Sequence, residues 1–231
     1  MESIKLLRDT VSLMRMIAAN RKLGNVKLKA KIEEAASVLE SMLGEISVDN
    51  VELARLINSK AREVYFKMEK NGLTSDVVNE INRLVKWCRM APYDFTDRIK
   101  YVRRGYRSYL YGMIIFFIVA GTYTQAYAIS ALILALPTVL AMMFTRRRLA
   151  TGLMLAFSTI PLPLAIFSWT AHYSIYALIN SGEALSLAGE LGLPVGLIYM
   201  ILLLYLTGSI SGMILLSAAV YYLYRNRYAF I

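Results

Sequence analysis

One long uncharged run constrains the fold of this chain more than any other feature. Residues 108–145 contain no Asp, Glu, Lys, Arg or His across 38 positions. A helix needs about 20 apolar residues to cross a bilayer, so the run is long enough to cross twice. Its most polar interior segment, residues 121–125, marks the expected turn. The run therefore predicts a hairpin of two membrane-spanning helices.

Cations flank this hairpin on both sides. Arg146, Arg147 and Arg148 follow it, and a second cluster precedes it. Because cytoplasmic segments beside membrane helices are enriched in Lys and Arg, both ends of the hairpin are expected in the cytoplasm. We expect the preceding cluster to contact anionic lipid headgroups. It consists of Arg98, Lys100, Arg103, Arg104 and Arg107.

Two further runs, residues 149–182 and 191–224, contain no Asp, Glu, Lys or Arg. If each forms one span, Arg225 and Arg227 stay on the cytoplasmic side and the acidic segment 172–192 lies outside. Dividing the last run would give halves of about 16 residues, which are short for a crossing. The sequence therefore predicts four spans with both termini in the cytoplasm of a cell (plasma) membrane protein, over residues 107–122, 125–145, 149–170 and 193–222.

The N-terminal part of the chain is charged and has helical periodicity. Residues 1–107 hold 21 of the 26 Lys and Arg and 14 of the 16 Asp and Glu. Its apolar residues recur at steps of three and four, and no segment alternates as a strand would. We expect stops near Gly24, Gly44 and Gly72, which favour an antiparallel four-helix bundle over one continuous coiled coil. The charged start of the chain does not have the apolar block of a signal peptide.

The sequence thus predicts an all-α protein in three parts. These are a basic cytoplasmic bundle over residues 1–92, a basic and aromatic connector over 93–107, and a four-span membrane domain over 108–231. Ser47 or Asp49 is expected to cap the third helix of the bundle, because both side chains accept hydrogen bonds from free N–H groups. Pro92 is expected to end the fourth helix.

Another group of cations lies between the first two predicted helices, within eleven residues that contain no acid. Two interpretations stay open: a solvated turn, or a patch for anionic lipid, a ribonucleoprotein or an acidic protein. No aromatic residue occurs in residues 1–64. Base stacking is therefore not expected, and we do not expect nucleic acid as a partner. The patch consists of Arg21, Lys22, Lys27, Lys29 and Lys31.

Small and proline residues mark the membrane domain. Gly208 and Gly212 are spaced to let a second helix approach closely, either within the chain or in a homo-oligomer. Pro161 and Pro163 fall inside the third span, where we expect a kink.

The sequence contains few residues that could perform chemistry. His172 is the one histidine and Cys88 the one cysteine, and no charged residue lies inside a predicted span beyond Arg107, at which the first span begins. Multi-His and multi-Cys metal sites are excluded, and no Gly-rich phosphate loop is found. We expect no catalytic residue, metal or cofactor. Asp94 and Asp97 are the remaining metal-binding alternative, although Asp94 and Thr96 are expected to cap the helix that follows.

The order of parts, a cytoplasmic bundle leading through a basic segment into paired spans, resembles that of assembly-platform proteins of secretion and surface-filament systems. The resemblance covers the layout of about the first 145 residues and not the glycine-centred repeats of that family. We expect an integral membrane scaffold or adaptor, with membrane lipids and other membrane or cytoplasmic proteins as partners. The alternatives are a transporter or channel for a neutral or lipidic solute, and an enzyme acting on lipid.

Overall fold

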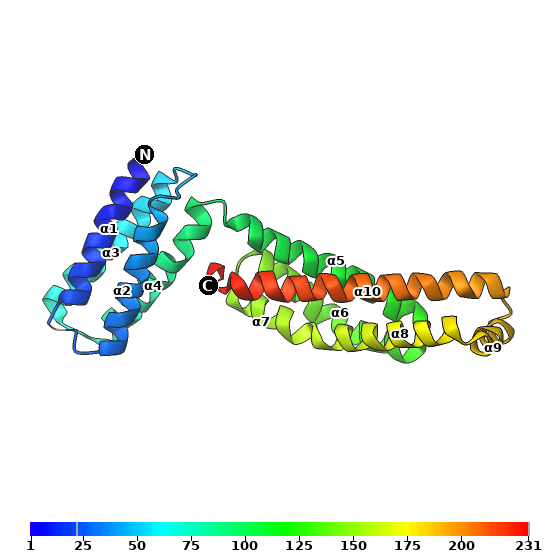
Figure 1. Ribbon diagram of the computed structural model, residues 1–231. Helices are drawn as coiled ribbons and strands as arrows, with labels where there is room; N and C mark the ends of the chain where they lie inside the picture. The colour runs from blue at the N-terminus through cyan, green and yellow to red at the C-terminus, as the bar shows by residue number, and fades with distance from the viewer. Residues whose placement is uncertain (22, 231) are drawn as a thin grey trace. The chain divides into compact units, whose positions relative to one another are not determined.

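The computed structural model describes residues 1–21 and 23–230, and every regular element in those ranges is a helix (Figure 1). The predicted all-helical class is therefore confirmed. The chain divides into two compact units, Met1–Lys100 and Tyr101–Phe230, which are called here the head and the C-terminal unit. The division falls inside the segment 93–107 that was expected as a connector.

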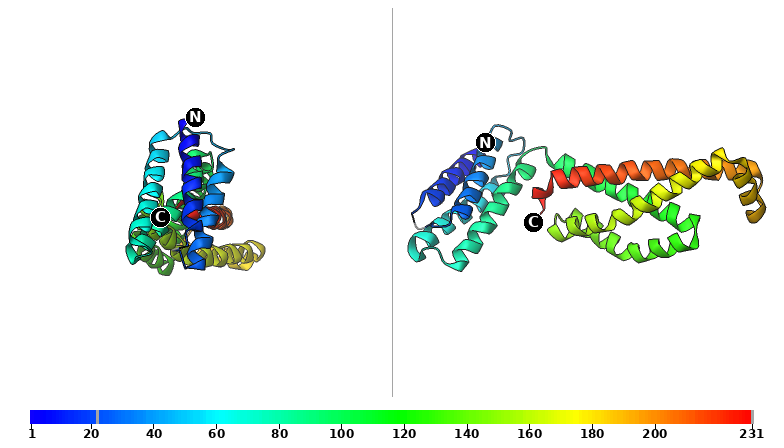
Figure 2. Two further views of the ribbon diagram at one scale, coloured as in Figure 1. Left: turned by 90° about the vertical axis from the view of Figure 1, so that its left-hand side faces the viewer. Right: turned by 60° about the horizontal axis from the view of Figure 1, so that its bottom comes forward.

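The head is a bundle of four helices, each of which buries one apolar face. Around the bundle the order is α1, α2, α4, α3, because α1 and α4 each pack against α2 and α3 (Figures 1 and 2). The core includes Leu7, Met14, Ile32, Leu39, Ile57, Met68 and Phe95. The helices are α1 (Glu2–Ala19), α2 (Val26–Met42), α3 (Val51–Asn71) and α4 (Ser75–Phe95).

Local chemistry explains where the helices of the head begin and end. Gly72 ends α3 with a φ of +69°, a conformation that glycine adopts without strain, and the Thr74 side chain caps α4. The end near Gly72 was predicted. The helix α1 ends at Ala19, well before Gly24. The predicted end at Pro92 is wrong, since α4 continues to Phe95, whose side chain is buried in the core.

The connection between α2 and α3, residues 43–50, corrects another expectation. Asn50, and not Ser47 or Asp49, caps α3: its side chain accepts a hydrogen bond from the Leu53 N–H at 3.1 Å. Asp49 Oδ1 instead accepts from the N–H of Ser3 at the start of α1, at 3.2 Å.

The same connection is bonded to the end of α4. The backbone N–H groups of Ser47 and Val48 both donate to the Phe95 carbonyl, at 3.0 and 3.1 Å. Arg98 forms an ion pair with Glu45 at 2.6 Å. The segment 43–50 is therefore hydrogen-bonded both to the first turn of α1 and to the end of α4, where the chain leaves the head.

The C-terminal unit contains three segments that are long and apolar enough to cross a membrane: Gln125–Arg146, Ala150–Ile179 and Val195–Arg225. The helix that holds the first of the four expected spans, α5, is not among them, because its first turns carry cations. The helices are α5 (Ile99–Tyr123), α6 (Gln125–Arg146), α7 (Ala150–Thr159), α8 (Pro161–Ile179), α9 (Ser181–Leu191) and α10 (Val195–Arg225), followed by a 3-10 turn at Arg227–Ala229.

The segment Ala150–Ile179 is interrupted at Ile160, directly before Pro161. Ile160 keeps helical angles, φ −71° and ψ −37°, so α7 and α8 follow one another through a kink. Pro161 and Pro163 have no N–H to donate, which removes two hydrogen bonds of the helix at this point. The hydroxyl of Tyr109 on α5 lies 2.7 Å from that of Thr159 and links α5 to the kink.

The outer segment is more helical than expected. Residues 172–179, part of the segment expected to lie outside, continue α8. The rest of that segment includes the short helix α9. In both Figures 1 and 2, α9 lies across the end of α8 and α10.

Candidate functional site

The hairpin of α3 and α4 is closed near its turn and open at its other end. Near the turn, Lys67 forms ion pairs at 2.7 Å with both Glu63 and Glu80. Over their whole length the two helices pack less extensively than the other neighbouring pairs of the bundle. An apolar groove therefore remains between the N-terminal turns of α3 and the C-terminal turns of α4.

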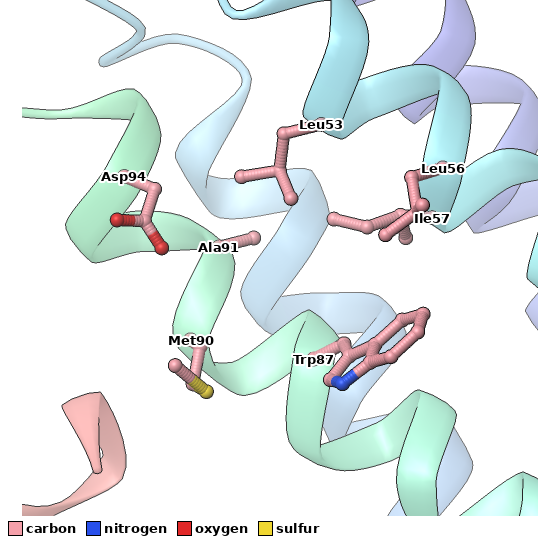
Figure 3. A pocket seen from close by; sticks show the side chains of 7 residues that line it. All are labelled: Leu53, Leu56, Ile57, Trp87, Met90, Ala91 and Asp94. Carbon is pink, nitrogen blue, oxygen red and sulfur yellow. The ribbon is translucent and has the colours of Figure 1, made fainter. Parts of the chain in front are cut away.

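The groove has a volume of about 230 Å³ and is lined from both helices (Figure 3). Ile57 and Ala91 are buried and form its floor, whereas Leu56 is half exposed. Figure 3 shows the α3 side chains directed toward those of α4, with a carboxylate at one end. The lining residues are Leu53, Leu56, Ile57, Trp87, Met90, Ala91 and Asp94.

A second hollow of about 430 Å³ continues the groove past Asp94. It shares Leu53 and Leu56 with the groove and adds Asn50 and Glu52, so that its lining includes two carboxylates. The combined surface has an apolar centre with Trp and Met and a polar, acidic end. Such a composition is typical of protein contacts, where Trp and Met are enriched and charges lie at the rim.

This arrangement is suited to recognition. Among the described residues, no group of three or more His, Cys, Asp or Glu side chains could hold a metal ion. Of the two expected capping residues, Thr96 accepts a hydrogen bond from the Arg98 N–H at its Oγ1, at 3.3 Å, whereas Asp94 lies inside α4. The groove residues Trp87 and Met90 were not predicted as functional.

The described residues of the predicted basic patch lie in two neighbouring segments. Arg21 lies in the connection between α1 and α2, and Lys22 lies outside the described residues. Lys27 and Lys31 are one turn apart on α2 and share a side of it. Lys29 points elsewhere, 3.9 Å from Glu33. The four described cations are exposed, and their role stays a prediction.

Most of the predicted juxtamembrane cations lie on one side of a single helix. Of the five, Lys100, Arg103, Arg104 and Arg107 lie on α5, within an arc of about 100° at helical spacing. The opposite side of these turns is buried through Val102, Gly105 and Tyr109. Arg98 precedes the helix and is paired within the head. Contact of these cations with lipid stays a prediction.

The two predicted packing glycines face different helices of the same chain. A Cβ atom at Gly212 would overlap with the ring of Phe167 on α8, so the backbone of α10 approaches α8 closely there. A Cβ atom at Gly208 would lie 3.5 Å from Val119 on α5, an ordinary contact.

The surroundings of several ionisable groups in the head shift their pKa values. Hydrogen bonds from Arg62 and then Asn58 lower the pKa of Asp9. Hydrogen bonds from Lys60 and Lys67 lower the pKa of Glu63 to about 2. Burial raises the pKa of the Cys88 thiol to about 12, so this thiol is poorly suited to nucleophilic chemistry.

Comparison of the chain with protein-family models, with curated proteins and with solved structures finds no match. The resemblance in layout to assembly-platform proteins is therefore not extended by any detected similarity. The groove of the head and the helices of the C-terminal unit remain as the basis for a function.

Proposed function

We propose that this protein is an integral membrane adaptor whose head binds an amphipathic helix of a partner protein in the α3–α4 groove. The observation that carries the proposal is the groove itself. It presents Leu56, Trp87 and Met90 beside the buried floor of Ile57 and Ala91. Helices commonly bind such grooves through apolar side chains spaced three or four residues apart.

The charge of the groove indicates which helix would bind. Its apolar part is large enough for one bulky aliphatic side chain, and the adjoining hollow ends at Glu52 and Asp94. A partner helix with a Leu, Ile or Met followed by Lys or Arg about one turn later would match both features. The partner is thus a protein with a basic amphipathic helix.

The distribution of cations supports a cytoplasmic head. In the C-terminal unit, Arg residues lie near the start of α5, at the end of α6 and in the turn after it, and at and just after the end of α10. The opposite end carries Glu183 and Glu190, and no Lys or Arg occurs in residues 149–224. By the positive-inside rule, α5 is then the first of four spans, and both termini lie in the cytoplasm of the cell membrane.

The groove can be tested with a photo-crosslinking amino acid at Leu56 in native membranes, and at Phe66 as the matched control. Both side chains are exposed on α3, at 50% and 67%, but only Leu56 lines the groove. We expect one protein to attach at Leu56 and not at Phe66. Its attached segment, made as a peptide, should bind the purified protein.

Two variants complete this experiment. Leu56→Glu places a charge in the groove and should weaken peptide binding by tenfold or more, about 1.4 kcal/mol. Phe66→Glu should leave it unchanged. An attached segment that is neither basic nor amphipathic, or equal effects of the two variants, would refute the proposed groove.

The orientation is tested separately. Protease added to sealed, right-side-out vesicles should leave residues 1–100 intact, because the head lies inside. Loss of the head under these conditions would show that the adaptor faces the other side.

A further inference from the structure

A larger cavity lies within the C-terminal unit, at the end away from its arginines. It has a volume of about 610 Å³, which lies within the range of small-molecule sites. The turn between α5 and α6 contributes to it, together with α8, α9 and α10. In Figures 1 and 2, α9 crosses the end of α8 and α10. Leu187 and Leu191 of α9 line the cavity.

Aromatic rings form one wall of the cavity and hold one another in place. The ring of Tyr123 meets that of Tyr205 edge to face at 5.1 Å, and that of Tyr173 at 6.2 Å. The Tyr205 hydroxyl donates to the Thr122 carbonyl at 3.0 Å, which fixes its ring further. Trp169 adds an indole at the exposed side. The negative faces of such rings attract cations.

The carboxylate of Glu183 is hydrogen-bonded to a tyrosine of this wall. The Tyr173 hydroxyl donates to Glu183 Oε1 at 2.8 Å, and Glu183 is half-buried at the start of α9. The second acid of this end is Glu190, and residues 149–224 contain no Lys or Arg. The local charge is therefore negative, which opposes an anionic headgroup and favours a cation.

The remaining wall is aliphatic. Leu187 of α9 and Ile198 and Leu202 of α10 supply it, and both α10 side chains are nearly fully buried. A ligand that fills the cavity must therefore place apolar groups on one side and meet the rings on the other, where the Glu183 carboxylate is hydrogen-bonded to Tyr173.

We propose that this cavity binds a lipophilic organic cation, a molecule with a bulky apolar body and a single positive charge. The charge lies toward Tyr173 and Glu183, and the apolar body packs against α9 and α10. This site is separate from the groove of the head, so that either can fail in experiment while the other stands.

The experiment uses the two tryptophans of the chain. Replacing Trp87 in the head by Phe leaves Trp169 as the one fluorescent indole, at the cavity. The full chain in lipid nanodiscs is titrated with tetraphenylphosphonium, and separately with tetraphenylborate, an anion of nearly the same shape. We expect saturable quenching with the cation and only nonsaturable partitioning with the anion.

Single-residue variants test which side chains cause the preference of the cavity for a cation. Glu183→Gln should weaken tetraphenylphosphonium binding by about tenfold, and Tyr173→Phe, which keeps the ring, should weaken it less. Glu190→Gln is the matched control, since it removes the same charge from an exposed position on α9 and should have a smaller effect than Glu183→Gln. Circular dichroism of each variant checks that the helices are kept, and Tyr173→Phe serves alone if Glu183→Gln does not fold.

Three results would overturn the proposal. Equal saturable binding of cation and anion would show an apolar site, such as one for a lipid chain. Equal losses in Glu183→Gln and Glu190→Gln would show a general surface potential. Absence of saturable binding of the cation would show that the cavity does not take this class of ligand.

Discussion

Replacing Gly212 by Ala tests the closest approach of two helices in the C-terminal unit. The added methyl group would overlap with the ring of Phe167, which is fully buried. That ring cannot retreat freely, because Phe116 packs edge to face against it at 6.2 Å. Overpacking of this kind costs about 1–3 kcal/mol, and the better helix propensity of Ala returns about 0.5–1 kcal/mol. We expect Gly212→Ala to destabilise the protein by roughly 0.5–2 kcal/mol.

Gly208→Ala is the matched control one turn away. Its methyl group would meet Val119 at 3.5 Å, so the variant should be as stable as the parent or slightly more stable. Unfolding by SDS in mixed micelles, followed by far-UV circular dichroism, gives both free energies. Equal effects of the two variants, or a Gly212→Ala protein as stable as the parent, would refute the close approach of α8 and α10. A change of oligomeric state in Gly212→Ala alone would assign this glycine to a dimer interface.

Three further predictions follow from single side chains. Cys88 should not react with a water-soluble maleimide at pH 8 until the head unfolds, as checked by mass spectrometry; rapid labelling of the folded protein would contradict its burial. The pKa of Glu63 is about 2 in the folded head and about 4.3 when unfolded, so its stabilisation is present above the unfolded value and is lost as the pH falls toward 2. Glu63→Gln should reduce the fall in the thermal midpoint of the head over this window, by a small amount because the side chain is partly exposed; an unchanged pH dependence would count against the ion pairs. Tyr109→Phe removes the hydroxyl bonded to Thr159 at the kink and should cost about 0.6–1.7 kcal/mol in the SDS titration, whereas an unchanged value would mean that the bond is replaced.

Periodicity and composition were enough to predict most helices. The span expected over 125–145 corresponds to the helix Gln125–Arg146, and the last expected span, 193–222, begins two residues before α10 and otherwise lies inside it. These elements are set by local properties: the run of apolar residues, the arginines that end it, and the glycine that ends α3. A local signal of this kind needs no knowledge of what the helix packs against.

The errors and omissions arise from contacts between distant parts of the chain. Asp49 is a good capping residue, but it does not cap the adjacent helix α3. It accepts a hydrogen bond from Ser3 in the first turn of α1, and these two residues are 46 positions apart in the sequence. Pro92 does not end α4, because the core holds Phe95 in place beyond it. The groove depends on how far α3 and α4 separate, and the cavity depends on the crossing of α9, neither of which is visible in a residue pattern.

The connection over residues 43–50 has a mechanical consequence. The chain leaves the head directly after Phe95, whose carbonyl is bonded to Ser47 and Val48, and Arg98 is bonded to Glu45 just beyond. A force pulling on residues 96–100 would load these bonds together with the buried side chain of Phe95. The head of the proposed adaptor would thus resist traction where the chain leaves it, as the proposed role of holding a partner at a fluid membrane would require.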